Sequence, residues 1–537
     1  MYLHEAVASI VRGHGVDTIF GLIGDGNLYF VDSFIRRQDG RYIPVAHEAS
    51  AVQAAAGYSR TTSRIGVATV THGPALTNTL TPLVEAVRAN TPLVLIAGDT
   101  AVVDKNNLQS VEQRPVILST GAAFEQVRSP ETIAEDVAWA FRRAELTRGP
   151  VVLNVPVDFQ WMEVKDGSAA PIPVVRQAVA ASDNALDAAL GIIASARRPI
   201  VLTGRGGTSP TARDAALGLA RRIGAPVATT LQARELFRGE PEDLGIFGTL
   251  STPKAVQAIG QADCVISLGA ALNQWTTAEQ GLLSGKRTVH VDIDAGALNR
   301  HVLVDAPVIG DLTTVCDQFI AALDAAGIRA TGFAAHVIKM PDELPPKVAD
   351  VSAGTVDVSD ALRRVDARFT EDRSLVIDGG RYFHHAAYNV RTGRPGSYVH
   401  TLEYGSIGLG MASAIGAAAA QPDTPVLLIC GDGGFMLGGL AEFNTAVRCG
   451  LDIVVVVMND GAYGAEHIQF RNKGMDPALS TFDWPDFAAV ARSLGGDGYS
   501  VREIADLESA LDAIAARTRP VLIDVHLDPD YVPSPYN

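Results

Sequence analysis

Cysteine, long apolar runs and positive charge are all scarce in this sequence. Four cysteines stand among 537 residues, at Cys264, Cys316, Cys430 and Cys449, and their spacing matches neither a metal site nor a disulfide framework. A cytoplasmic protein with reduced thiols is therefore expected. The longest apolar runs, such as residues 453–458, fall well short of the ~20 residues of a membrane helix. The N-terminus shows no signal-peptide pattern.

The balance of charge is acidic. Asp and Glu number 60 against 44 Lys and Arg, which gives a formal net charge of −16 and argues against a general nucleic-acid binder. A chain of 537 residues, 47% of them hydrophobic, is too long for a single core. We therefore expect about three domains.

Short runs rich in valine and isoleucine alternate with amphipathic helical stretches along the chain. Strands of this kind are typically buried on both faces of a parallel sheet. The alternation predicts an α/β fold of doubly wound parallel sheets. The expected strands cover residues 92–97, 150–155, 199–203, 264–268, 288–293, 374–377, 426–430, 453–458 and 521–525.

Two stretches interrupt this alternation. Residues 165–174 are rich in Gly, Ala and Pro, and residues 339–354 in Pro, Asp and Ala, as is typical of linkers. They divide the chain into blocks at 1–165, 175–335 and 350–537. Each block is expected to be one domain, and the first and last could be two versions of one architecture.

The strongest chemical signal lies in the last block. The strand at 426–430 runs into a Gly-Asp-Gly-Gly turn that contains Asp432, and the next strand ends at Asn459 and Asp460. Glycines after a strand let the backbone approach a phosphate, and the following helix N-terminus favours negative charge. Carboxylate and amide oxygens suit Mg²⁺. These residues predict a site for magnesium and phosphate, although a Gly-Asp-Gly segment alone could be an ordinary turn.

This arrangement resembles the diphosphate-binding motif of thiamine-diphosphate (ThDP) enzymes of the decarboxylase and acetolactate-synthase type. Three further segments match that family in the same order. Glu48 follows an expected strand at 42–46, a Gly-Pro turn lies at 71–78, and Tyr-Gly-Ser-Ile-Gly lies at 404–408. The resemblance implies that the first domain binds the pyrimidine of ThDP and the last binds its diphosphate and Mg²⁺.

The family chemistry explains why a glutamate is needed. The cofactor carbon C2 must lose a proton, and a carboxylate hydrogen-bonded to the pyrimidine in an apolar setting promotes that loss. The resemblance gives this role to Glu48, whose alternative is a helix-start glutamate that stabilises the helix dipole. Ile407 would support the bent cofactor, or be a core isoleucine, and the Gly405 carbonyl would accept a bond from the cofactor's amino group.

The metal ligands depend on how the motif is counted. The usual 27 residues after Asp432 lead to Asn459. Compared with the family pattern, the segment 433–440 is one residue longer than usual, which moves the ligand to Asp460, where the family usually has Asn. We prefer Asp460 with the Ala462 carbonyl and keep Asn459 as the alternative. The resemblance implies further cofactor contacts at Pro74, Asn78, Gly380, Arg381, Tyr382, Gly433, Gly434, Tyr463 and Gly464.

Two carboxylates are candidates for work on the substrate. Asp25 stands in a Gly-Asp-Gly-Asn-Leu segment that resembles pyruvate decarboxylases, and Glu466 falls where those enzymes have a glutamate. Acids with separated pKa values could protonate the intermediate left after CO₂ loss. The alternatives are a turn aspartate and an exposed helix glutamate.

Other positions resemble acetolactate synthases more closely. Gln109 could match a synthase glutamine, whereas His72 replaces a small residue and puts a titratable or purely structural group near the cofactor. Further candidates for facing the substrate are His384, His385, Ala465 and His467.

The middle block carries no clear cofactor signal. Its glycine-rich turn at 203–207 is weak evidence for a nucleotide. Relatives that bind FAD use an arginine that the corresponding segment 269–273 lacks. We expect a structural, nucleotide-fold-like central domain without FAD.

The combined features predict non-oxidative decarboxylation of a 2-oxo acid as the main function. The alternatives are acetolactate synthase-like carboligation, cleavage of a 1,2-diketone or acyloin, and a non-catalytic relative that binds ThDP only for assembly. The resemblance also implies that the cofactor lies between two chains of a homodimer or homotetramer. No nucleic-acid or membrane partner is expected.

Overall fold

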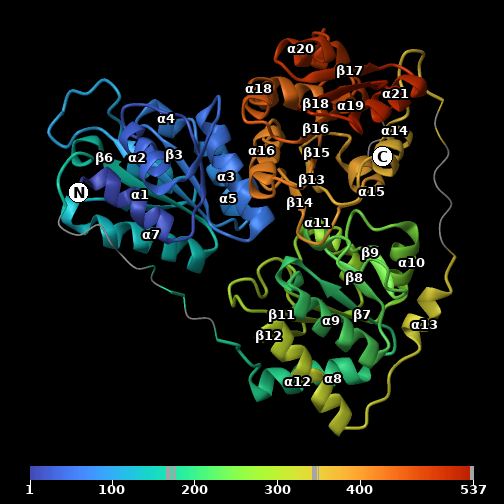
Figure 1. The fold of residues 1–537 in the computed structure, drawn as a ribbon. Coiled ribbons are helices and arrows are strands. Elements are labelled where there is room, and N and C mark those ends of the chain that lie inside the picture. The colour runs from blue at the N-terminus through green and yellow to red at the C-terminus, as the bar shows by residue number, and fades with distance from the viewer. Residues whose placement is uncertain (165–170, 172, 175–176, 342–347, 349, 532–537) are drawn as a thin grey trace. The chain divides into compact units, whose positions relative to one another are not determined.

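The computed structural model describes residues 1–164, 171, 173–174, 177–341, 348 and 350–531 (Figure 1). The chain forms three six-stranded parallel sheets with helices between the strands, which confirms the predicted fold class. All nine expected strands are present. The central parts of both expected linkers, at 165–170, 172, 342–347 and 349, lie outside the described residues.

The chain divides into two compact units. One unit contains residues Met1–Val174, Val348–Gly393 and Val399–Asn537, and therefore both the first and the third sheet. The other contains Val175–Lys347 and Arg394–Tyr398. None of the helices in the described ranges has the length and apolar character needed to cross a bilayer.

The first sheet has the strand order β2-β1-β3-β4-β6-β5. Alternate residues of β4 enter two different cores: Leu93 and Leu95 contact the layer of α3 and α5, and Val94 and Ile96 the layer of α1, α2 and α7. Both faces of the sheet are therefore covered. Its strands are β1 Thr18–Gly21, β2 Arg41–Pro44, β3 Gly66–Val70, β4 Leu93–Asp99, β5 Ala123–Gln126 and β6 Pro150–Pro156, and its helices are α1 Leu3–Gly13, α2 Leu28–Gln38, α3 Glu48–Thr62, α4 Pro74–Thr77, α5 Leu80–Arg88, α6 Gln113–Leu118 and α7 Ile133–Thr147.

The third sheet has the order β14-β13-β15-β16-β18-β17. When the strands are numbered from β13, this order is the same as that of the first sheet numbered from β1. The match is as expected for two versions of one architecture. Its strands are β13 Ser374–Ile377, β14 Tyr398–His400, β15 Val426–Gly431, β16 Ile453–Asn459, β17 Asp497–Val501 and β18 Val521–His526, and its helices are α14 Val358–Arg368, α15 Phe383–Asn389, α16 Gly410–Ala420, α17 Asp432–Gly434, α18 Leu440–Arg448, α19 Gly464–Asn472, α20 Phe487–Ser493 and α21 Ile504–Ile514.

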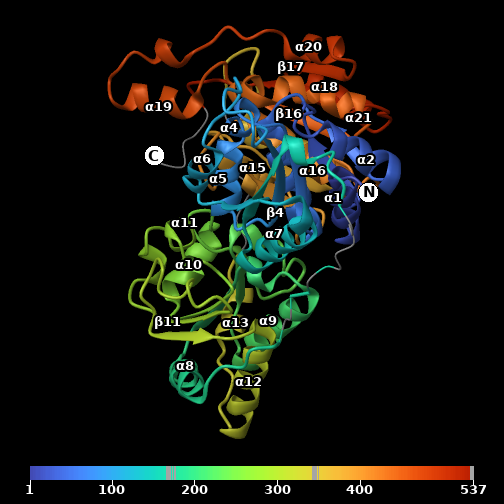
Figure 2. The same ribbon diagram turned by 90° about the vertical axis from the view of Figure 1, so that its left-hand side faces the viewer.

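The second sheet has the order β12-β11-β10-β7-β8-β9, which is the strand order of classical dinucleotide-binding folds. Helices α9 and α12 lie side by side against one face (Figure 2). Its strands are β7 Pro199–Thr203, β8 Val227–Thr229, β9 Asp243–Ile246, β10 Cys264–Leu268, β11 Arg287–Asp292 and β12 Ala306–Ile309, and its helices are α8 Asp183–Ser195, α9 Pro210–Ile223, α10 Pro253–Gln261, α11 Gln274–Thr277, α12 Leu312–Ala325 and α13 Phe333–Ile338.

Helices α3 and α16 join the first and third sheets through a close crossing. A Cβ atom on Gly57 would lie 2.4 Å from the carbonyl oxygen of Ser413, and one on Gly416 would lie 2.0 Å from that of Ala54. Gln53 donates to the Ser413 hydroxyl over 2.8 Å within this contact. The two backbones therefore touch only because both positions are glycine.

Candidate active site

The segment Gly405–Gly408 packs against the glycine turn that contains Asp432. A Cβ on Gly434 would lie 3.4 Å from the Gly408 nitrogen and 3.7 Å from the Ile407 Cβ. Ile407, which is predicted to support the bent cofactor, therefore lies next to the Gly-Asp-Gly-Gly turn that is predicted to bind the diphosphate. The two motifs are separated by 24 residues of sequence (408 to 432) and by helix α16.

Asp378, which the sequence analysis missed, holds this arrangement together. Its side chain accepts bonds from the Gly408 N–H at 2.9 Å and from the Thr401 hydroxyl at 2.5 Å. Burial raises the pKa of Asp378, and these hydrogen bonds oppose the rise. Its position directly after β13, at the carboxyl edge of the sheet, was the available signal.

Two acidic side chains meet at the ends of the neighbouring strands β15 and β16. Burial and the adjacent charge of Asp460 raise the pKa of Asp432 to about 7. Burial also raises the pKa of Asp460, against the effect of Arg381. The Trp484 indole N–H donates to Asp432 over 2.8 Å. Two buried, mutually repelling carboxylates fit a hard divalent cation, whose charge would offset theirs.

The segment after Asp432 contains a π-helical turn at Phe435–Gly439. Single π-helical turns inside helices occur frequently at functional sites. The amide of Asn459 donates to Asp524 over 2.9 Å, whereas Asp460 lies beside Asp432. Of the two proposed ligands, Asp460 is thus the one that shares the surroundings of Asp432.

The described residues contain no cluster of three or more His, Cys, Asp or Glu side chains able to hold a metal. Asp432 and Asp460 would thus leave several positions of an octahedral Mg²⁺ for a carbonyl, such as that of the buried Ala462, and for phosphate oxygens and water. A Cβ on Gly433 would lie 2.5 Å from the Tyr463 ring, so these two predicted contact residues pack directly together.

Tyr382 closes the turn after β13 that contains Gly380 and Arg381, and all three residues are predicted to contact the cofactor. Its hydroxyl donates to the Asp378 carbonyl over 2.8 Å, and its ring is buried. Gly380 has a φ of +155°, and a Cβ there would lie 2.3 Å from the Tyr382 ring. Arg381, the residue between them, turns to Asp460, with Nη2 2.7 Å from Oδ2.

Glu48 is the first residue of α3 and is partly exposed. The amide of Asn78 donates to its carboxylate over 3.0 Å, which brings together two residues predicted to serve the cofactor. Pro74 begins the short helix α4, directly after Gly73 with a φ of +61°. In the described part of the chain, no hydrogen bond or ion pair joins Glu48 to Gly405, Ile407 or Asp432.

A carboxylate from the third sheet's domain holds the start of α3. Glu442 on α18 accepts the backbone N–H groups of Ala46 and His47, at 3.0 and 3.2 Å. Strand β2 consequently ends at Pro44, two residues before the end predicted from the sequence, because these N–H groups bond a side chain instead of the sheet.

A carboxylate of the first sheet's domain makes the equivalent contact with the third sheet's domain. Buried Glu85 on α5 accepts the backbone N–H groups of Glu403 and Tyr404, at 3.1 and 2.6 Å, directly before Gly405. Burial raises the pKa of Glu85. The segments that precede Glu48 and Gly405 therefore bind different helices, α18 and α5.

His72 and Asp25 lie near each other. Thr71 donates to Asp25 over 2.9 Å, and the His72 Nε2 atom lies 3.9 Å from the Asp25 carboxylate. The His72 ring is 1% exposed and its Nε2 has no hydrogen-bond partner among the described residues, whereas the Asp25 side chain is 66% exposed. The backbone of Gln109 packs on the same turn, since a Cβ on Gly73 would lie 2.2 Å from its carbonyl oxygen.

The candidates of the last block are placed differently. Glu466 and Ala465 lie exposed at the start of α19, and none of the described hydrogen bonds or ion pairs joins Glu466 to Asp25. His467 is buried and paired with Asp530 at 3.0 Å. Burial lowers the pKa of His384 to about 4, with a smaller effect from His385.

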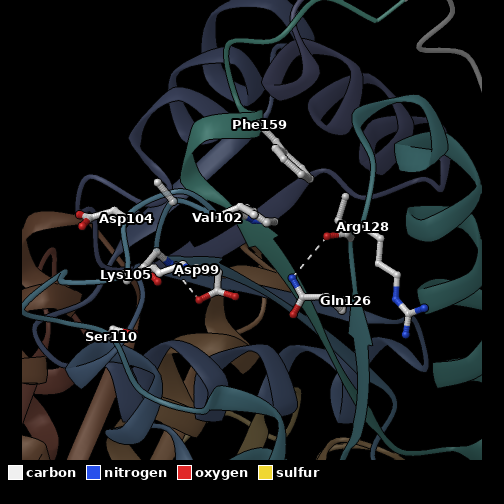
Figure 3. Close-up of a pocket in the computed structure, with 12 residues that line it drawn as sticks. Asp99, Val102, Asp104, Lys105, Ser110, Gln126, Arg128 and Phe159 are labelled. Carbon is white, nitrogen blue, oxygen red and sulfur yellow. Dashed lines mark hydrogen bonds between the residues drawn. The ribbon is translucent and has the colours of Figure 1, made fainter.

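A pocket of about 420 Å³ lies at the carboxyl ends of β4, β5 and β6 (Figure 3). Asp99, Lys105 and Gln126 are among the residues that line it, and none of the predicted cofactor residues does. Asn154 donates to Asp99 over 2.6 Å and accepts from Gln113, which in turn accepts from the Gly73 N–H at 2.8 Å. A buried polar chain thus connects the pocket's edge to the Gly-Pro turn.

Comparison with known proteins agrees with this geometry. Three family models of thiamine pyrophosphate enzymes match this chain. The model of the N-terminal TPP binding domain matches residues 1–119, that of the central domain residues 186–319, and that of the C-terminal TPP binding domain residues 378–525. The acetolactate synthase large subunit of Parasynechococcus marenigrum is 30% identical over 97% of this chain and 87% of that protein. The chain belongs to the ThDP enzyme family.

Other members of the family are similar along nearly the whole chain. The probable acetolactate synthase large subunit of Methanocaldococcus jannaschii is 26% identical and covers 98% of this chain, with 92% of its own length matched. The sulfoacetaldehyde acetyltransferase of Castellaniella defragrans is also 26% identical, over 97% of this chain and 92% of that protein. The chain is therefore a ThDP-dependent enzyme.

Proposed function

We propose that this ThDP enzyme is a carboligase, which joins an acyl unit from a 2-oxo acid to a second carbonyl compound. When bound, ThDP supplies a nucleophilic carbon that attacks a carbonyl group and carries the acyl unit. Similarity to acetolactate synthases along the whole chain is the observation that carries the proposal. The acetyltransferase relative also supports group transfer over simple decarboxylation.

Glu48 is proposed to hold a proton against the pyrimidine ring. The Asn78 amide, 3.0 Å away, would orient its carboxylate. The Gly405 carbonyl would accept from the cofactor's amino group, and Ile407 would support its bent shape. Asp432, Asp460 and the Ala462 carbonyl are proposed to hold Mg²⁺ at the diphosphate.

His72 is proposed to move a proton at the oxygen of the acceptor carbonyl. Its buried Nε2 makes no hydrogen bond among the described residues and lies 3.9 Å from the Asp25 carboxylate. A positioned group of this kind contributes about 10²–10⁴-fold to a reaction rate. The Asp25–His72 proximity also supports the second candidate, decarboxylation with release of an aldehyde.

A second copy of the chain is proposed to complete the site. The loop before Gln109 exposes Val102, Val103 and Leu108, at 62%, 84% and 97%, and the turn after Asp432 exposes Leu437 at 65%. Apolar side chains exposed beside predicted site residues are typical of an interface. Their position supports the homodimer, or a tetramer built from it.

The decisive experiment supplies ThDP, Mg²⁺ and a panel of 2-oxo acids and 1,2-diketones, with and without acceptor aldehydes or 2-oxo acids. CO₂ and organic products are measured together. A carboligase releases CO₂ with an equal amount of ligated hydroxyketone product. Free aldehyde as the main product would refute carboligation in favour of the lyase, and cleavage of a 1,2-diketone without CO₂ would support the third alternative.

A further inference from the structure

The ion pair between Arg381 and Asp460 has an unusual setting for a metal ligand. The Arg381 Nη2 lies 2.7 Å from Asp460 Oδ2, and their side chains are only 4% and 10% exposed. Arg381 Nη1 also donates to the Pro529 carbonyl over 2.8 Å. Burying two charged groups is unfavourable unless their geometry compensates. The pair is therefore poorly explained as a simple stabilising contact.

The fold makes room for this pair at Gly464. A Cβ atom at that position would lie 2.3 Å from Asp460 Oδ2 and 2.9 Å from Arg381 Nε. The pair thus occupies the space that a side chain on the first residue of α19 would need. Both the loop after β13 and the start of α19 are shaped around it.

The pair leaves the two oxygens of Asp460 in different surroundings. Oδ2 bonds Arg381, whereas Oδ1 accepts a longer bond, 3.2 Å, from the Ala462 N–H and no other in the described part of the chain. Without Arg381, Asp432 and Asp460 would place two negative charges beside a diphosphate that is itself negative. With it, Asp460 and Arg381 together are neutral, as a single asparagine would be.

We propose that Arg381 is the charge-balancing residue of the metal and diphosphate site. It neutralises Asp460 through Oδ2 and leaves Oδ1 to the cation, so that the pair acts as one neutral oxygen ligand. This inference rests on the proposed Mg²⁺ and diphosphate site, and it explains how an aspartate serves where the family usually has asparagine.

The test is a double-mutant cycle with Arg381→Met, Asp460→Asn and the combined variant. Binding of Mn²⁺ alone and of ThDP with Mg²⁺ is measured by calorimetry, with the thermal unfolding of each ligand-free protein. Loss of the positive charge should tighten Mn²⁺ binding about tenfold in Arg381→Met and weaken ThDP binding about tenfold. Asp460→Asn alone should weaken Mn²⁺ binding about tenfold.

The combined variant decides the matter because it replaces the pair by a neutral amide. Both affinities should return to within about threefold of the wild type. A combined variant that keeps the Mn²⁺ affinity of either single variant, or Mn²⁺ affinity unchanged in Arg381→Met, would overturn the inference. A double variant that recovers Mn²⁺ but not ThDP binding would also overturn it, since Arg381 would then contact the diphosphate directly.

A buried pair elsewhere in the same domain provides the matched control. Arg373 and Asp366, with side chains 2% and 11% exposed, form an ion pair away from the proposed ligands. Arg373→Met should lower thermal stability and leave Mn²⁺ affinity unchanged. Wild-type protein that binds neither Mn²⁺ nor ThDP would contradict the proposed function itself, whereas wild-type binding with Mn²⁺ affinity unchanged in Arg381→Met contradicts only the role of Arg381.

Discussion

The Glu442 Oε1 atom lies 3.2 Å from the backbone nitrogen of His47, the residue directly before Glu48. Glu85 makes the equivalent contact with Tyr404, at 2.6 Å, before Gly405. The first and third sheets share one strand order, and these contacts occupy corresponding places in it. Glu442 therefore fixes the backbone directly before Glu48, and Glu85 fixes the backbone directly before Gly405. Both Glu48 and Gly405 are proposed to contact the cofactor.

Replacement of Glu442 should affect both stability and turnover. Glu442→Ala removes the acceptor of two N–H groups and should lower the free energy of unfolding by about 1–3 kcal/mol. It should also lower turnover, because Glu48 loses its fixed position, while Glu442→Gln should retain most of both. Glu508→Ala, which removes half-exposed ion pairs, is the control and should change stability by about 0–1 kcal/mol. Equal effects of the two alanine variants on turnover would refute the positioning role.

The α3–α16 crossing should tolerate no side chain at its glycines. Gly416→Ala would put a Cβ 2.0 Å from the Ala54 carbonyl and should lower stability by about 1–3 kcal/mol through overpacking. In Gly191→Ala, on α8, the new Cβ meets nothing within 4 Å, so that variant should instead be stabilised by about 0.5–1 kcal/mol. Thermal or urea unfolding measures both changes, and a stable Gly416→Ala variant would contradict the crossing.

The low pKa of His384 predicts a pH dependence of stability. Burial lowers its pKa to about 4, so the unfolded chain, with an ordinary histidine near 6.5, binds the proton more readily. The neutral His384 ring makes its full contribution to the free energy of unfolding above pH 6.5, and this contribution is lost as the pH falls toward 4. In urea unfolding at pH 7 and pH 5, His384→Phe should lose less stability on acidification than the wild type. An identical loss in both proteins would contradict this prediction.

His72→Asn should slow the proposed transfer step and leave cofactor binding intact. The asparagine amide cannot transfer a proton as the imidazole can, so turnover should fall about 10²–10⁴-fold while ThDP affinity stays unchanged. His14 offers a matched control, because it is another histidine of the same domain whose buried Nε2 makes no hydrogen bond among the described residues. His14→Asn should alter stability but not turnover, whereas wild-type turnover in His72→Asn would remove the catalytic role.

Local pattern was enough to predict much of this fold. The nine Val- and Ile-rich runs became strands because such runs suit sheets buried on both faces. The position of Asp432 directly after a strand was also predicted, and the structure places it directly after β15. These features depend on neighbouring residues, and the sequence displays them directly.

The partners of the site residues could not be predicted in the same way. Glu442 is separated from His47 by 395 residues, and Glu85 from Tyr404 by 319. Nothing in either helix distinguishes these acids from exposed ones, since their burial results from the packing of α3 on α16. The ion pair of Arg381 with Asp460 likewise depends on the space left by Gly464.

The central claim is that Glu48 activates the cofactor, and Glu48→Gln tests it most directly. ThDP affinity and steady-state turnover are measured together, with Glu135→Gln, an exposed first-turn glutamate of α7, as the control. The account predicts that Glu48→Gln still binds ThDP and Mg²⁺ but turns over at least about 100-fold more slowly. Wild-type turnover by a Glu48→Gln enzyme with ThDP bound would contradict it.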